Sequence, residues 1–93
     1  MELPINYDQA HWTVRKVARE QYIEEQNGLC YHCKEPLIGS PSKKIVNKPI
    51  NKKLFPKSMF KYPIHLHHSH VDGFTIGSVH SKCNAVLWQY NGE

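Results

Sequence analysis

The sequence predicts a small α+β domain in which one helix precedes two strands and a second helix. Residues 8–27 show the apolar spacing of an amphipathic helix, and residues 64–79 alternate as a β-hairpin does. The chain has only 93 residues, and a chain this short buries too little apolar surface to be stable without a cross-link such as a bound metal. We therefore expect a single α+β domain with a stabilising ion.

The helix at residues 8–27 is expected to begin next to Asp8 and to end before Gly28. Asp8 is a favourable N-cap residue, and glycine readily takes the left-handed conformation that ends many helices. The apolar side of the helix consists of Trp12, Val14, Val17, Ala18, Tyr22 and Ile23. The other side carries three basic residues, which could contact phosphate groups or simply face solvent: Arg15, Lys16 and Arg19.

Residues 28–38, GLCYHCKEPLI, are predicted to form a metal-binding turn, or zinc knuckle. Cys30 and Cys33 are separated by two residues, a spacing that lets two thiolates converge on one cation. Redox proteins share this spacing, but no strand–helix–strand pattern of the thioredoxin kind follows it here. The chain has three cysteines, which cannot form a closed set of disulfides and therefore favour reduced thiols and a metal ion.

The other half of the metal site is expected in VHSKCNAVLWQY, residues 79–90. His80 and Cys83 repeat the two-residue gap, and the apolar residues that follow favour a helix, on which positions i and i+3 share a face. His32, inside the knuckle, is a competing fourth ligand. We expect one structural Zn²⁺ with the ligands Cys30, Cys33, His80 and Cys83.

Residues 39–63 are predicted to be a basic loop. They contain seven lysines and no acidic residue, and the formal net charge of the chain is +4. Such a density of positive charge is typical of a surface that binds a polyanion, although a lysine-rich loop can also serve solubility alone. The residues of this loop expected to contact nucleic-acid phosphates are Lys43, Lys44, Lys52 and Lys53.

Four histidines fall within six positions of the predicted hairpin, whose strands are expected at residues 64–68 and 74–79. In a regular strand His67 and His68 point to opposite sides, so they can share one site only if the strand ends or bends there. His70 could bind metal or phosphate, or simply pack in the turn. His65 is expected to make a structural hydrogen bond on the strand.

The predicted ββα unit at residues 64–90 also brings an asparagine toward these histidines. Asn84 follows the zinc ligand Cys83 and lies about 100° further around the helix. It can therefore face away from the zinc and back toward the histidine strand.

Three segments resemble the HNH, or ββα-metal, nucleases: EEQNGLCYHCKEPL, LHHSHVDG and HSKCNAVL. Within that family the closest likeness is to the endonuclease VII branch of phage recombination enzymes. The resemblance implies a zinc-stabilised ββα-metal fold with an N-terminal helix. It also implies that His67 binds a catalytic divalent metal, that Asn84 completes this metal site and that His68 is the general base.

The chain departs from the pattern of that branch at several positions. His67 stands where the branch has aspartate, as in colicin-type nucleases, which makes the site less anionic and widens the expected catalytic metals to Mg²⁺, Mn²⁺ or Ni²⁺. Ser69 replaces a second aspartate, and His80 replaces a cysteine of the zinc site. No counterpart of the long C-terminal dimerisation region is seen, so we expect a monomer or weak dimer that does not resolve DNA junctions.

The resemblance implies a metal-dependent endonuclease that hydrolyses DNA phosphodiester bonds by nicking, with weak sequence preference. The alternatives are a non-catalytic, zinc-stabilised DNA-binding module, with phage packaging or recombination proteins as partners, and a nuclease that cleaves RNA. His67, His68 and Asn84 together favour an enzyme, because a binding module does not need them. No apolar run could cross a membrane and no secretory signal precedes the first helix, so we expect the cytoplasm, that of a bacterial host if a phage encodes the protein.

Overall fold

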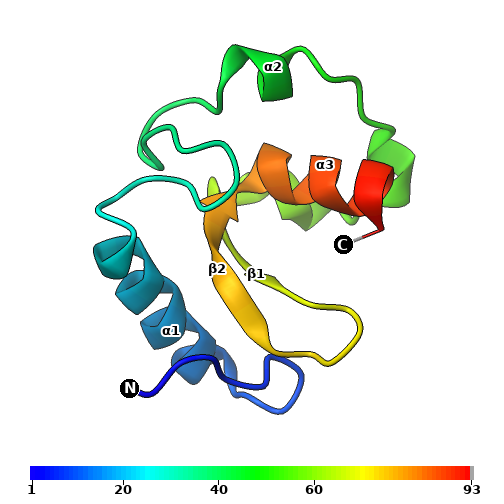
Figure 1. Ribbon diagram of the computed structural model, residues 1–93. Coiled ribbons are helices and arrows are strands. Elements are labelled where there is room, and N and C mark those ends of the chain that lie inside the picture. Colours follow the sequence, from blue (N-terminus) through cyan, green and yellow to red (C-terminus); the bar gives the residue numbers. More distant parts are fainter. Residues whose placement is uncertain (93) are drawn as a thin grey trace.

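The computed structural model describes residues 1–92 and shows an α+β arrangement built around one β-hairpin (Figure 1). The hairpin lies between the first and the last helix, and the segment at residues 39–63 passes over the last helix. The elements, in chain order, are the helix α1 (Trp12–Glu25), the short helix α2 (Lys43–Val46), the 3-10 helices η1 (Lys52–Leu54) and η2 (Lys57–Lys61), the strands β1 (Ile64–His68) and β2 (Thr75–His80), and the helix α3 (Ser81–Asn91).

The strands β1 and β2 pair in antiparallel fashion, as the alternating pattern predicts. His67 lies opposite Gly77, but His68 lies opposite Thr75, so the register shifts between the two histidines. β1 ends at His68, and Gly73 closes the turn with a φ of 80° and a hydrogen bond from its N–H to the carbonyl of Ser69. The prediction that the strand ends or bends at these histidines is confirmed.

Helix α1 begins at Trp12, and the prediction that Asp8 caps it is wrong. The N-cap is His11, whose side chain accepts a hydrogen bond from the backbone N–H of Thr13. The residues before it are held in a turn, because the side-chain oxygen of Asn6 accepts hydrogen bonds from the backbone N–H groups of residues 8 and 9. This segment also pairs with the hairpin turn through the isolated bridge between Asn6 and Phe74, which keeps it out of the helix.

The predicted faces of α1 are only partly right. Ala18 is fully buried, but Trp12 is 66% exposed and Val17 is 48% exposed. Arg15 and Arg19, expected on the outer side, are half-buried on the side that faces the sheet, whereas Lys16 is exposed. The sheet presents hydroxyl groups to this helix: Ser78 Oγ donates to the carbonyl of Arg19, and Thr75 Oγ1 bonds to the Tyr22 hydroxyl. The apolar spacing of the sequence does not predict these polar contacts.

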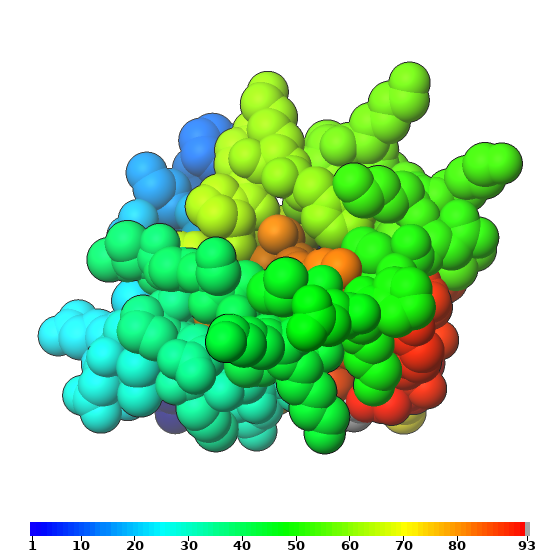
Figure 2. All heavy atoms as spheres, turned by 90° about the horizontal axis from the view of Figure 1, so that it is seen from above, coloured from blue at the N-terminus to red at the C-terminus, as the bar shows by residue number. Residues whose placement is uncertain are grey.

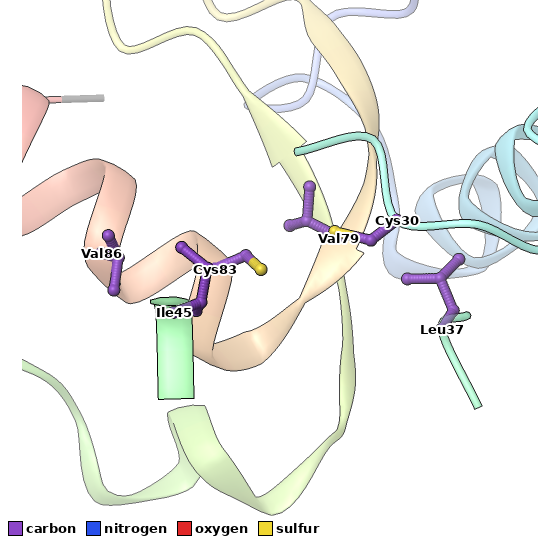
Figure 3. Close-up of a cluster of buried hydrophobic side chains, with 6 residues drawn as sticks. All are labelled: Cys30, Leu37, Ile45, Val79, Cys83 and Val86. Carbon is purple, nitrogen blue, oxygen red and sulfur yellow. The ribbon is translucent and has the colours of Figure 1, made fainter. Parts of the chain in front are cut away.

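The apolar core lies where the knuckle, β2 and α3 meet (Figure 3). Figure 3 shows the sulfur of Cys83 pointing toward β2, with Ile45 of α2 beside it. The segment at residues 39–63, predicted to be a loop, contains α2, η1 and η2. It is anchored by Ile45, which is 5% exposed, and it covers one face of the molecule (Figure 2, green). The buried members of the core are Cys30, Leu37, Ile45, Val79, Cys83 and Val86.

A close approach at Gly77 yields a test of this packing. A Cβ atom added there would lie 2.9 Å from Gln26 Oε1 and 2.9 Å from Tyr31 Cγ. The side-chain amide of Gln26 is already bound to the backbone N–H and carbonyl of Ser78, so it cannot move without losing these bonds. We expect Gly77→Ala to lower the free energy of unfolding by about 1–3 kcal/mol, measured by urea denaturation.

The matched control is Gly39→Ala, because the nearest atom to a Cβ added at Gly39 is a carbonyl oxygen 3.7 Å away. Equal stability of the two variants would contradict the close packing of β2 against the end of α1.

Candidate functional site

Four side chains converge on one point between the knuckle and the first turn of α3. Their ligand atoms, three sulfurs and one imidazole nitrogen, all lie within 4.8 Å of one another, and three of the four residues are buried. His80 Nδ1 is 3.4 Å from Cys33 Sγ and 3.7 Å from Cys83 Sγ. Donors bound tetrahedrally to one zinc ion are separated by roughly 3.3–3.8 Å, so this spacing fits a metal. The four residues are the predicted set: Cys30, Cys33, His80 and Cys83.

The knuckle itself selects the nitrogen of His80 that faces the sulfurs. The backbone N–H of Cys30 donates to the carbonyl of Glu35, and that of Lys34, whose φ is 66°, donates to the carbonyl of Cys30. The turn so formed places the carbonyl of Pro36 2.8 Å from His80 Nε2. Because Nε2 donates its proton to this carbonyl, the lone pair lies on Nδ1. His32, the competing fourth ligand, is exposed and outside the group.

The electrostatics of the cluster also suit a cation. A hydrogen bond with Cys83 is the main reason that the pKa of Cys30 falls to about 4, against the opposing effect of burial. The same hydrogen bond, with burial second, raises the pKa of Cys83. These opposite shifts both arise from the close approach of the two buried sulfurs, one of which carries the proton of their hydrogen bond. A divalent cation would replace that proton and bind both sulfurs as thiolates.

At the end of β1, the ring of His68 stacks on Tyr7. The ring centroids are 3.8 Å apart and the interplanar angle is 5°. The guanidinium of Arg15 lies 3.9 Å from the centroid of the same Tyr7 ring, and its Nε donates to the carbonyl of Tyr7. Two groups this close to one ring must occupy its opposite faces. His68 is thus held by a stack that includes Arg15 of α1, and the sequence offered no signal for the part that Tyr7 plays.

His68 is half-buried and has a second histidine beside it. The centroids of His68 and His70 are 4.9 Å apart. Burial lowers the pKa of His68, His70 lowers it further, and Asp8 acts in the opposite direction. The neutral imidazole is therefore favoured, and a neutral imidazole can accept a proton.

Asn84 faces the histidine strand, as its position on α3 predicts, and its partner is His65. The amide nitrogen of Asn84 donates to His65 Nδ1 over 3.2 Å. Burial lowers the pKa of His65, which keeps this nitrogen an acceptor. The structural hydrogen bond expected for His65 is thereby confirmed. His67 is only 4% exposed, and its charge contributes to the lowered pKa of His68.

Two cavities meet at Asn84. The larger, of about 700 Å³, is a groove that reaches from α1 to η2 and also contains His65. The smaller, of about 270 Å³, lies between η1, η2 and α3 and contains His70. Asn84 and Met59 line both. The structure therefore brings His70 to the same small cavity as Asn84 and to the side of His68, while His67 lines neither cavity.

The lysines predicted to contact phosphate are spread along α2 and η1. All four are exposed, and they belong to the segment at residues 39–63. These residues are Lys43, Lys44, Lys52 and Lys53. Figure 2 shows part of α3 (orange) in a hollow between the green and yellow-green parts of the same segment. Among the described residues, no helix has the length and apolar character needed to span a bilayer.

No protein-family model, curated protein sequence or solved structure matches this chain. The chemistry of the site therefore rests on its own geometry. That geometry consists of a Cys3His group that could hold zinc, a pair of neighbouring histidines at the end of β1, and an asparagine next to Cys83 that bonds to His65 on β1.

The metal site can be tested by removing one ligand. We expect the purified protein to hold about one zinc ion per chain and His80→Ala to lose both the metal and most of the folded structure, because metal binding and folding are coupled in small domains. Metal content and thermal unfolding are the measurements. His32→Ala is the matched control, since this exposed histidine lies in the same knuckle outside the ligand group. A fully folded protein without bound metal would contradict the assignment.

Proposed function

We propose that the protein is a metal-dependent HNH endonuclease that hydrolyses DNA phosphodiester bonds. The observation that carries this proposal is the orientation of Asn84. It follows Cys83 of the Cys3His group in the chain, but its side chain points the other way and bonds to His65 on β1. A zinc-stabilised binding module needs Cys83 alone. The asparagine, together with a histidine pair at the strand end, supplies the groups that phosphodiester hydrolysis requires.

His68 is the proposed general base. Hydrolysis requires that a water molecule lose a proton as it attacks the phosphorus, and a neutral imidazole accepts that proton near neutral pH. Burial and the neighbouring His70 favour the neutral form of His68, and the stack on Tyr7 limits the orientations of its ring. His70, whose ring lies beside that of His68, would donate a hydrogen bond to a phosphate oxygen.

His67 and Asn84 are the residues that would hold the catalytic cation. An imidazole nitrogen and an amide oxygen are a donor set that Mn²⁺, Ni²⁺ or Mg²⁺ accepts. The amide nitrogen of Asn84 is bound to His65, which leaves its oxygen to face a cation. When bound, such a cation would neutralise the negative charge that builds on the phosphate and on the departing oxygen. His67, almost fully buried, would be held in one orientation.

The basic residues would bind the DNA backbone. The four exposed lysines of α2 and η1 lie on the segment that covers α3, the helix that carries Asn84. Arg15, Lys16 and Arg19 line the groove that Asn84 also lines. The exposed lysines would serve a non-catalytic DNA-binding module equally well. Such a module leaves the Asn84–His65 contact and the histidine pair unexplained, so the nuclease is preferred.

Loss of the base should separate chemistry from binding. We expect His68→Ala to lower the rate of plasmid nicking by roughly 10²–10⁴-fold, with little change in zinc content or DNA affinity. Asn84→Ala should also lose activity, but high Mn²⁺ concentrations should partly restore it, because a weakened cation site still works when filled. Nicking of supercoiled plasmid across a series of divalent-ion concentrations measures both effects.

The matched control is His11→Ala, because His11 is exposed and far from the histidine strand in sequence, at the N-cap of α1. Nicking by His68→Ala at the wild-type rate, with chelator controls excluding a contaminating nuclease, would overturn the assignment of the base.

The lysines can be tested through salt dependence. Substituting Lys43, Lys44, Lys52 and Lys53 by alanine should weaken DNA binding and flatten its dependence on salt, because each lost phosphate contact removes up to about 0.9 from the log–log slope. Fluorescence anisotropy of a labelled duplex at several salt concentrations measures the slope. Lys34→Ala serves as a control, since Lys34 packs over Tyr31 in the knuckle. An unchanged slope in the quadruple variant would mean that these lysines do not touch DNA.

A further inference from the structure

The groove of about 700 Å³ lies between α1 and the segment that leads into β1, and its lining is basic. Lys16 is exposed, whereas Arg15 and Arg19 are half-buried. Among residues 1–92, no acidic side chain lines the groove. The guanidinium of Arg15 is held in place by the ring and the carbonyl of Tyr7. A cleft with fixed positive charge and no acidic neighbour favours an anionic ligand.

Two large aromatic side chains border the same groove from opposite elements. Trp12 begins α1 and is 66% exposed, and Tyr62 follows η2 and is 61% exposed. Figure 2 shows the start of α1 (blue) and the segment before β1 (yellow-green) reaching the same face of the molecule. Exposing rings of this size to water is unfavourable, and here two of them border one basic cleft. This pairing points to a ligand with aromatic faces as well as negative charge.

Nucleic-acid strands combine these two properties, but only unpaired nucleotides present the faces of their bases. In an intact duplex the base faces are covered by neighbouring pairs, so phosphate contacts alone are available to such a groove. Basic grooves that carry exposed aromatic rings are the usual means of holding single strands. The exposed lysines of α2 and η1 do not line this groove, and they would bind the phosphates of single-stranded and duplex nucleic acid alike.

The groove also reaches Asn84, one of the residues proposed to carry the reaction, and a neighbour of the proposed base. Asn84 and His65 line it, and so does Tyr7, on whose ring His68 stacks. A strand in the groove would therefore pass Asn84, one of the proposed cation ligands, and Tyr7, whose ring carries the proposed base on one face. From these contacts we propose that the groove binds an unpaired stretch of nucleic-acid strand, with bases stacked on Trp12 and Tyr62 and phosphates held by the basic residues of α1. This inference rests on the proposed function and names the substrate class of that site.

The test is a binding measurement that does not depend on cleavage. The protein carries His68→Ala, the buffer holds no added divalent ion, and the probes are fluorescein-labelled oligo(dT), oligo(rU) and a duplex of the same length. We expect at least one single-stranded probe to bind more tightly than the duplex. Trp12→Ala and Tyr62→Ala should each weaken single-strand binding by roughly 5- to 150-fold, the range expected for loss of one stacked base, and should change duplex binding much less.

Two control variants make the result specific. Trp12→Phe keeps a stacking ring and should retain most of the single-strand affinity. Phe74→Ala removes an aromatic side chain of 43% exposure that does not line the groove, and it should leave binding unchanged. Circular dichroism of each variant shows whether it is folded. If Trp12→Ala does not fold, Tyr62→Ala decides the case.

The inference is overturned if the duplex binds as tightly as both single strands, or if Trp12→Ala and Tyr62→Ala bind oligo(dT) and oligo(rU) like the parent protein. Plasmid nicking by wild-type protein in the presence of Mn²⁺ tests the proposed function separately. Nicking without single-strand preference would reject only the groove assignment. Single-strand preference that depends on Trp12, without any nicking, would reject the nuclease and keep the groove as a strand-binding site.

Discussion

The convergence of three sulfur atoms and one imidazole nitrogen is the constraint on which the rest of the fold depends. Cys30 and Cys33 come from a turn ahead of the hairpin, whereas His80 and Cys83 come from the end of β2 and the first turn of α3. The buried cysteines also belong to the apolar core. Without a cation, bringing these four donor atoms together in a buried space costs free energy. A bound cation would instead link distant segments of a chain that has little other core.

This junction also determines where Asn84 and the histidine strand lie relative to each other. Because Cys83 must face the other sulfurs, the next residue on α3, Asn84, is turned toward β1, where its amide meets His65. His80 is the last residue of β2 and also belongs to the Cys3His group. It therefore fixes the end of β2 with which β1 pairs in regular register, from Ile64 to His67. In the proposed enzyme, the structural metal would therefore set the spacing of the catalytic residues while taking no part in the reaction.

Two basic regions with different chemistry accompany this centre. The exposed lysines of α2 and η1 lie on a segment that only Ile45 ties deeply into the core, which suits contacts that depend on charge and not on exact geometry. In the groove beside α1, side chains contact one another closely, because Arg15 lies against Tyr7 and Tyr7 against His68. In the proposed enzyme, the charge of the lysines and the shape of the groove would complement each other in binding a nucleic-acid strand.

The sequence by itself determined the metal ligands and the hairpin, because donor spacing and strand alternation are local properties. The gaps of two residues predicted Cys30, Cys33, His80 and Cys83 without knowledge of the surroundings. Tertiary structure alone decided that Arg15 and Arg19 of α1 are half-buried while Trp12 is exposed. The contacts of α1 with β2 include hydroxyl groups, and the apolar spacing of the sequence does not reveal them. Tertiary structure also decided that a tyrosine near the N-terminus stacks on His68, a contact that forms only when the N-terminal segment pairs with the hairpin turn.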